Sequence, residues 1–258
     1  GAGLAQWNVT TAVYRDEFSV ALKEADPQSV HFKPDGTKMY IVGSDGSTID
    51  EYDLGTQWDV TTAVYRAEKS VVSKEVRPRG VFFKPDGTKM CTIGTDGDSV
   101  DEYDLGIQWD VTTAVYVHEF DVGVKEIVPR GLYFKPDGTK MYTIGSDGVT
   151  VDEYDLVTPW DVSTAVYRAE ISVAARETTP EGLDFKPDGT KMYTIGSGGD
   201  TVDEYDLGTQ WDVTTAVYRA EISVAAKDSR HRGVTFKPDG TKMYIVGTDG
   251  KAVYEYDL

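Results

Sequence analysis

Residues 84–90 read KPDGTKM, and the same seven letters recur at a fixed interval of 51 residues. The other copies begin at Lys33, Lys135, Lys186 and Lys237. The tryptophans keep the same interval, at Trp7, Trp58, Trp109, Trp160 and Trp211. Such a period is typical of repeat proteins, in which one unit buries its faces only by stacking on its neighbours. Five units account for residues 4–258, so we expect one domain there and interpret Gly1, Ala2 and Gly3 as a cloning remnant.

Within one unit, four short runs rich in β-branched and aromatic residues are separated by turn signals. They are residues 63–72, 80–84, 89–94 and 99–105. Pro85-Asp86-Gly87 and Thr95-Asp96-Gly97 are the tight turns between the later runs. No segment keeps a helical period over three turns. Four antiparallel strands repeated in this way predict an all-β, closed five-bladed β-propeller.

The two chain ends predict how the ring closes. The first run, residues 12–20, corresponds to the outermost strand of a blade, and the last run, residues 252–258, corresponds to a third strand. We therefore expect the N-terminal strand to complete the last blade beside Tyr254. This pairing would remove an exposed sheet edge.

The repeated stretch FKPDGTKMYTIG, at residues 134–145, resembles the F-x-P-D-G-x-x-L-Y-V pattern of YVTN-type, lactonase-like and WD-repeat-like propellers. The whole unit, ending in EYDLxTPWDVSTAxY, resembles highly repetitive propellers of bacterial and phage proteins. That resemblance implies an extracellular, cell-surface or virion-associated location. It is specific for the fold but not for the function, because propellers carry many unrelated functions.

Composition and charge exclude several classes of protein. The 258 residues are 40% hydrophobic and 27% charged, which is too apolar for a disordered chain, and no long uncharged apolar run predicts a membrane span. The net charge of −18 opposes binding to nucleic acid or to an anionic membrane. The single cysteine, Cys91, excludes an internal disulfide framework and a cysteine-based zinc site. We expect a monomer with no cofactor and no metal.

Positions that differ among the five units indicate where a ligand would bind. One variable column lies on the innermost run and holds His31, Phe82, Tyr133, Asp184 and Thr235. Another lies just before it and holds Gln28, Arg79, Arg130, Glu181 and Arg232. Because strands alternate in direction within a blade, we expect both columns at one mouth of the central channel, together with the preceding loop residues Arg77 and Arg230.

The loops leading into the innermost runs carry a summed charge of +3 within a strongly acidic chain. A basic channel mouth would attract an anionic group, and arginine suits carboxylate or phosphate oxygens. The candidate arginines are Arg77, Arg79, Arg130, Arg230 and Arg232, while Phe82 and Tyr133 would offer apolar contact. With His31, Glu181, Asp184 and Thr235 they form the predicted ligand-binding set.

The hypothesis with most support from the sequence is a non-catalytic recognition module for a glycan, a peptide or a protein. Three alternatives stay open: a multivalent lectin that uses the five tryptophans, a structural or engineered scaffold, and a hydrolase at the channel mouth. No Ser-His-Asp arrangement, phosphate loop or nucleotide fingerprint is present. The recurring run Asp101-Glu102-Tyr103-Asp104 is interpreted as pairing with the lysines of KPDGTK rather than as a calcium site.

Overall fold

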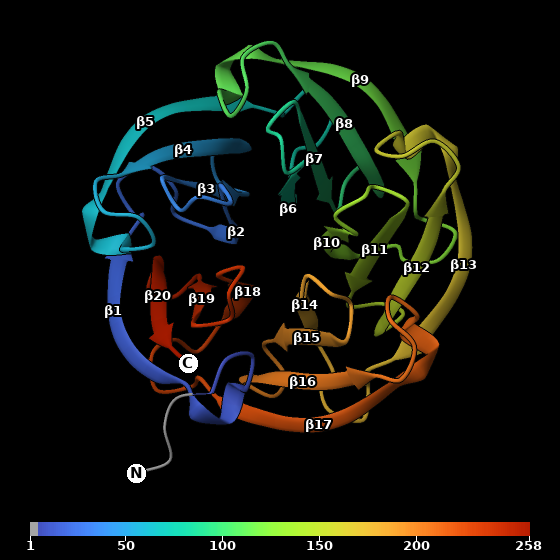
Figure 1. Ribbon diagram of the computed structural model, residues 1–258. Coiled ribbons are helices and arrows are strands. Elements are labelled where there is room, and N and C mark those ends of the chain that lie inside the picture. Colours follow the sequence, from blue (N-terminus) through green and yellow to red (C-terminus); the bar gives the residue numbers. More distant parts are fainter. Residues whose placement is uncertain (1–4) are drawn as a thin grey trace.

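The computed structural model describes residues 5–258 as five four-stranded antiparallel sheets arranged in a ring (Figure 1). The predicted all-β five-bladed propeller is therefore confirmed. Residues 1–3, interpreted as a cloning remnant, lie outside the described residues. No helix in residues 5–258 has the length and apolar character needed to cross a membrane.

Each blade runs from an inner strand at the axis to an outer strand at the circumference. Blade 1 contains β2 (Pro27–Phe32), β3 (Lys38–Gly43), β4 (Thr48–Leu54) and β5 (Ala63–Ser70). Blade 2 contains β6 (Pro78–Phe83), β7 (Lys89–Gly94), β8 (Ser99–Leu105) and β9 (Ala114–Asp121). Blade 3 contains β10 (Pro129–Phe134), β11 (Lys140–Gly145), β12 (Thr150–Leu156) and β13 (Ala165–Ser172). Blade 4 contains β14 (Pro180–Phe185), β15 (Lys191–Gly196), β16 (Thr201–Leu207) and β17 (Ala216–Ser223).

Blade 5 confirms the predicted closure of the ring. It contains β18 (His231–Phe236), β19 (Lys242–Gly247) and β20 (Ala252–Asp257), and its outer strand is β1 (Val13–Ser19) from the start of the chain. The β1–β20 register runs from Val13 opposite Asp257 to Ser19 opposite Ala252. The first and last described strands thus lie side by side (Figure 1).

A single turn of 3₁₀ helix precedes each outer strand, and the sequence did not predict it. The five turns are η1 (Val9–Thr11), η2 (Val60–Thr62), η3 (Val111–Thr113), η4 (Val162–Thr164) and η5 (Val213–Thr215). In η2 the Asp59 side chain accepts a hydrogen bond from the amide of Thr61, as an N-cap does. Three residues are too few to produce a helical period in the sequence.

The tryptophans join the blades and are buried. Trp58 is 8% exposed, has a φ of 64°, and donates its amide to the carbonyl of Gly36 at 3.0 Å. Its own carbonyl accepts the phenolic hydroxyl of Tyr244 from blade 5 at 2.6 Å. Gly36 must be glycine, because its φ is 73° and a Cβ there would lie 2.3 Å from the indole nitrogen.

A buried glutamate crosses each blade junction. Glu51 accepts the ammonium of Lys38 at 2.6 Å on one oxygen and the amide of Val111 in blade 2 at 3.1 Å on the other. Lys38 also reaches Asp53 at 2.6 Å. The predicted pairing of the acidic run with the lysines is thereby confirmed. The same contacts recur at Glu102, Glu153, Glu204 and Glu255.

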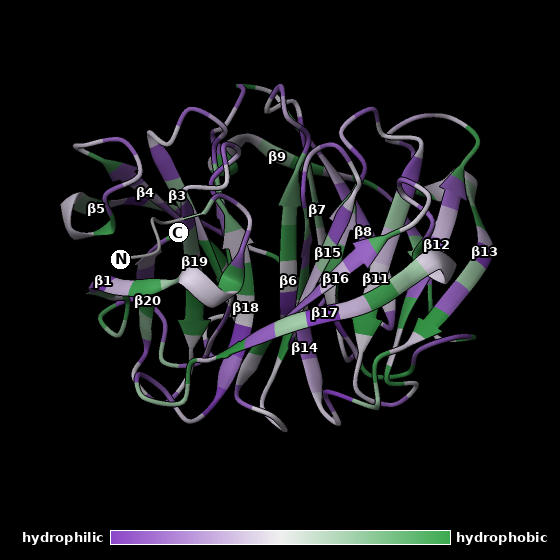
Figure 2. Ribbon diagram, turned by 60° about the horizontal axis from the view of Figure 1, so that its bottom comes forward, coloured by the Kyte–Doolittle hydropathy of each residue, from purple (hydrophilic) through white to green (hydrophobic). Residues whose placement is uncertain are grey.

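Four of the blades bury a second carboxyl group. Burial raises the pKa of Asp50, Asp101, Asp152 and Asp203 to about 6 in each case. Blade 5 replaces this aspartate by Tyr254, whose hydroxyl lies 3.0 Å from the carboxylate of Asp228. In Figure 2, hydrophobic residues occupy part of β6 and part of β19, two strands of the protein interior.

The closure predicts the effect of a truncation. Deleting residues 1–21 removes β1 and leaves β20 as an unpaired edge, so we expect loss of most of the stability and self-association through that edge. Thermal unfolding and light scattering after gel filtration measure both effects. A truncated chain that stays monomeric with an unchanged melting temperature would contradict this pairing.

The buried indoles predict a large effect of Trp109→Ala. Trp109 is 7% exposed, and its indole packs against Tyr40 of blade 1 and Phe83 of blade 2 at centroid distances of 6.3 and 5.6 Å, so its loss leaves a void at a blade junction. We expect a loss of ~3–5 kcal/mol in the free energy of unfolding, measured by denaturant titration. Unchanged stability combined with loss of sugar binding would instead support the lectin alternative.

The four buried aspartates predict a pH dependence of stability. Their folded-state pKa lies above the ordinary 3.8, so the folded state binds these protons more tightly than the unfolded chain does. The contribution of these four groups to the free energy of unfolding is therefore greatest below about pH 4 and is lost as the pH rises through about 6. Changing all four aspartates to asparagine removes this contribution, so the variant should lose less stability than the wild type between about pH 5 and about pH 7.5.

Thermal unfolding of both proteins at the two pH values measures the effect. His31, whose pKa is lowered by burial, acts in the opposite direction, and Asp184, whose pKa burial raises to about 7, acts in the same direction. Both are present in the two proteins and cancel in the comparison. An equal pH slope in the two proteins would show that these carboxyl groups ionise as readily in the folded state as in the unfolded chain.

Candidate functional site: the axial channel

The inner strands β2, β6, β10, β14 and β18 surround an axial channel, and equivalent residues form layers along it. At one end is the proline mouth, formed by Pro34, Pro85, Pro136, Pro187 and Pro238. Next comes the variable ring, formed by His31, Phe82, Tyr133, Asp184 and Thr235. At the other end is the arginine ring, formed by Gln28, Arg79, Arg130, Glu181 and Arg232.

The variable ring and the arginine ring lie at opposite ends of the channel, which corrects the expectation of one shared mouth. The two columns are three residues apart on the same strand, or ~10 Å at ~3.3 Å per residue. A layer of valine and leucine separates them, with Val81 and Leu132 as examples. The direction of a strand identifies the rim at which that strand begins. An inner strand, however, spans the whole channel and presents side chains at both mouths.

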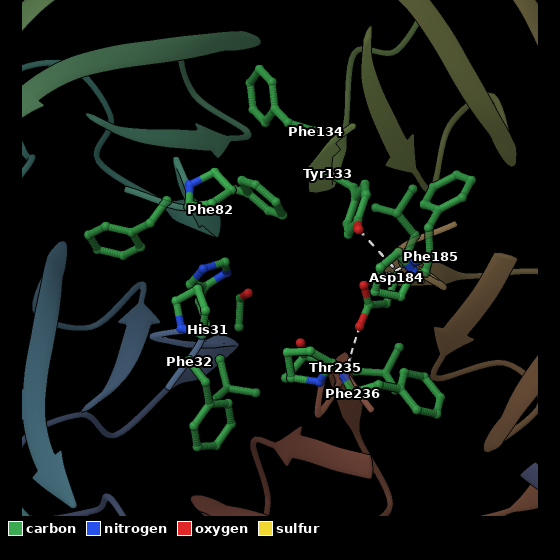
Figure 3. A pocket seen from close by; sticks show the side chains of 18 of the residues that line it. His31, Phe32, Phe82, Tyr133, Phe134, Asp184, Phe185, Thr235 and Phe236 are labelled. Atoms are coloured by element: carbon green, nitrogen blue, oxygen red, sulfur yellow. Dashed lines mark hydrogen bonds between the residues drawn. The ribbon is translucent and has the colours of Figure 1, made fainter. Parts of the chain in front are cut away.

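A cavity of about 180 Å³ opens at the proline mouth and is lined by all five residues of the variable ring. Figure 3 shows His31, Phe82, Tyr133, Asp184 and Thr235 around its centre, with Phe32, Phe134, Phe185 and Phe236 farther out. The prediction that the variable column faces the channel is in agreement with this placement. An engineered cavity of ~150 Å³ holds a benzene molecule, so this one has room for a single small ring.

One side of the cavity is aromatic. His31 and Phe82 have ring centroids 4.9 Å apart, and Phe82 and Tyr133 have centroids 5.0 Å apart, both edge to face. The Tyr133 hydroxyl lies 3.5 Å from the carbonyl of Phe185 in blade 4. The three rings thus contact one another from blade to blade, and all three residues line the cavity. Burial lowers the pKa of His31 to about 3, so its imidazole is neutral.

The other side of the cavity is polar, with Asp184 and Thr235. The two carboxylate oxygens of Asp184 accept the amides of Phe185 and Phe236, each at 2.8 Å. Both amides belong to inner strands, which have no strand partner on the channel side. Burial raises the pKa of Asp184 to about 7, although these two hydrogen bonds act to lower it. The carboxylate and the aliphatic hydroxyl of the variable ring thus lie together on this side, opposite the aromatic rings.

The arginine ring is built by a β-bulge and by glycine. Opposite β11, Pro129 pairs with Gly145 and Gly131 pairs with Ile144, so Arg130 is an extra residue with no partner in the ladder. The same irregularity occurs in every blade. A Cβ on Gly182 would lie 2.9 Å from the carbonyl of Arg232, so the inner strands approach closely at this level. Bulge and close approach together direct the charged side chains toward one another.

Two of the three arginines in this ring contact one carboxylate. Arg232 donates to Glu181 at 2.6 Å, and Arg130 lies 3.6 Å from the other oxygen of Glu181. The side chains of Arg130, Glu181 and Arg232 are 17%, 2% and 8% exposed. Arg79 differs, because its Nε is buried without a hydrogen-bond partner. The predicted cluster of these three arginines is therefore present.

Arg77 and Arg230 do not join the ring. Each is more than half exposed and pairs with an aspartate of a nearby turn, Arg77 with Asp96 and Arg230 with Asp249. They lie in the loops before the inner strands, outside the bulge that directs residues toward the axis. The expectation that all five arginines converge on the channel is wrong for these two.

The structure also brings together Glu102, His118 and Asp161, a group that the sequence analysis missed. His118 lies on β9, the outer strand of blade 2, and the other two come from distant positions, so no motif spacing marks them. The Glu102 carboxylate already accepts Lys89 and the amide of Val162. Its oxygens are occupied by the blade junction, so we assign this group to the framework.

No family model and no curated protein matches the chain. Among solved structures, a protein from Lactobacillus plantarum shows 14% identity and a TM-score of 0.55, over 86% of this chain and 64% of that one. A Bacteroides uniformis protein described as a "putative 6-phosphogluconolactonase" shows 14% identity and a TM-score of 0.56, over 91% and 67%. Hydrazine synthase from Kuenenia stuttgartiensis shows 15% identity and a TM-score of 0.52, over 92% and 96%.

This chain thus spans less than two thirds of the Lactobacillus plantarum chain. At identities of 14–15%, the three similarities establish the propeller fold and no particular ligand or activity.

Proposed function

We propose that this protein is a non-catalytic recognition module that binds a small ring-shaped ligand in the cavity at the proline mouth. The observation that carries the proposal is the variable ring. In a chain whose units otherwise repeat closely, the five side chains around this cavity are an imidazole, a phenyl, a phenol, a carboxylate and a hydroxyl. Packed cores preserve volume and polarity, whereas ligand sites combine apolar walls with a few polar groups.

The two sides of the cavity indicate the class of ligand. The aromatic side, His31 to Tyr133, suits the face or edge of a planar or pyranose ring. The polar side suits a hydroxyl or amine that donates to Asp184 or Thr235. A monosaccharide unit or a phenol-sized molecule combines both features. Of the ligands that the sequence suggested, the terminal sugar of a glycan meets this description.

Two features support binding without catalysis. Burial lowers the pKa of His31 to about 3, so its imidazole is too weak a base to activate a nucleophile near pH 7. Both oxygens of Asp184 accept backbone amides. The lectin alternative with five equivalent tryptophan sites has less support, because the five indoles are 7–8% exposed and pack at blade junctions.

A filling substitution tests the proposal. Thr235→Phe places a phenyl group in the cavity, and the framework accommodates an aromatic residue there, since Tyr133 occupies the same position opposite Tyr142 as Thr235 does opposite Tyr244. The probes are phenol, indole, glucose, galactose and N-acetylglucosamine, measured by saturation-transfer NMR and titration. We expect the wild type to bind at least one probe and the variant to bind it about tenfold more weakly or worse, because the cavity volume is lost.

The matched control is Ile107→Thr, since threonine occupies this position in blades 1, 3 and 4 and Ile107 is 61% exposed outside the cavity. Its probe binding and melting temperature should equal those of the wild type. Failure of the wild type to bind any of the five probes, or undiminished binding by Thr235→Phe, would contradict the proposed function.

A further inference from the structure

The arginine ring carries positive charge that its own partners do not neutralise. Three guanidinium groups, from Arg79, Arg130 and Arg232, lie near two carboxylates. Glu181 contacts Arg130 and Arg232, and Asp26 accepts the side-chain amide of Gln28, the fifth member of the ring, at 2.7 Å. This excess lies within a chain whose net charge is −18, so it is not part of a generally basic surface.

Blade 2 contains two buried polar atoms that lack partners in this region. In blade 5 the Nε of Arg232 donates to the hydroxyl of Thr248 at 2.9 Å, and in blade 3 the Nε of Arg130 lies 3.5 Å from that of Ser146. The corresponding atoms of blade 2 are the Nε of Arg79 and the hydroxyl of Thr95, and both are buried without a partner. In blade 2 these two atoms do not pair with each other, so the buried Nε of Arg79 is left without an acceptor, which is costly.

We infer that the arginine ring binds one oxyanion group, a carboxylate or a phosphate, between Arg79 and Arg130. Such a group would accept from the Nε of Arg79 and from the hydroxyl of Thr95, and would reduce the repulsion among the arginines. Guanidinium groups present paired N–H donors that match these oxygens. Glu181 already plays the same role toward Arg232, which shows that this layer accommodates a carboxylate.

The electrostatics of Arg79 agree with this assignment. Burial and the neighbouring Arg130 lower the pKa of Arg79 to about 10, although Asp26 and Glu181 act to raise it. A cavity of about 20 Å³, with room for about one water molecule, lies in the same layer beside Arg130, Glu181 and Arg232, and Arg79 does not line it. The site lies at the opposite mouth from the cavity of the proposed function and uses none of its residues.

The experiment uses sodium phosphate and sodium acetate as probes, each compared with sodium chloride at equal ionic strength. Calorimetric titration and thermal unfolding are measured for the wild type, Arg79→Gln and Arg77→Gln. Glutamine occupies the equivalent position in blade 1, so Arg79→Gln should fold. Arg77→Gln is the matched control, because it removes the same charge two residues away from a side chain paired with Asp96.

We expect phosphate or acetate to stabilise the wild type, with the stronger of the two identifying the class of oxyanion. Arg79→Gln should bind that anion about tenfold more weakly, the effect typical of one charge-assisted hydrogen bond. Arg77→Gln should bind within about twofold of the wild type. The affinity should decrease as salt is added.

A second variant keeps the test independent of folding effects. Glu181→Gln removes the internal carboxylate that competes for the arginines, so this variant should bind the anion more tightly than the wild type. Absence of any difference between phosphate, acetate and chloride in the wild type would overturn the inference. Equal weakening in Arg79→Gln and Arg77→Gln would also overturn it, because it would mean that general surface charge attracts the anion. Neither result bears on the cavity at the proline mouth.

Discussion

The ring depends on one buried carboxylate at each blade junction. Glu51 lies between the ammonium of its own blade, on Lys38, and a backbone amide of the next blade, on Val111. An ionised group can be buried only when charge and hydrogen bonds compensate it, and removal of one partner of a buried pair commonly costs ~3–5 kcal/mol. In a blade separated from its neighbour, the glutamate would lose the backbone amide that helps to compensate its charge. The contact joins one surface of a blade to a different surface of the next blade. It therefore recurs at every junction until the last blade meets the first.

The framework could be predicted from the sequence because its determinants repeat. The interval of 51 residues, the turn signals around Pro85-Asp86-Gly87 and the partial strand at each terminus were sufficient for the blade number and the closure. The interpretation of the lysine and acid columns also agreed with the structure, since cross-strand pairing follows from strand alternation. These features are local or recur five times, so misplacing one strand boundary by a residue or two does not change the predicted fold.

The channel was predicted only in part. Its layers depend on an extra residue in each inner strand, such as Arg130, and on the level at which a side chain meets the axis. A signal for the bulge was present, because glycine follows the bulged residue in four units, at Gly80, Gly131, Gly182 and Gly233. Glycine inside a strand indicates a bulge or a close approach of another backbone. The sequence alone does not reveal which mouth a given layer faces, since that requires the length of the strand along the channel.

The bulge has a consequence for how such a protein diversifies. Away from the axis, a residue contacts a residue at a different position of the repeat, so exact duplication of a unit reproduces each favourable contact. Glu51 and the amide of Val111 in the next blade are an example. On the axis, a column meets only its own copies. Five identical arginines there would repel one another, whereas glycine, valine or leucine is compatible with itself. Fivefold symmetry therefore permits a uniform apolar layer, but a charged layer must break that symmetry, and the bulged residue can change without disturbing the ladder beside it.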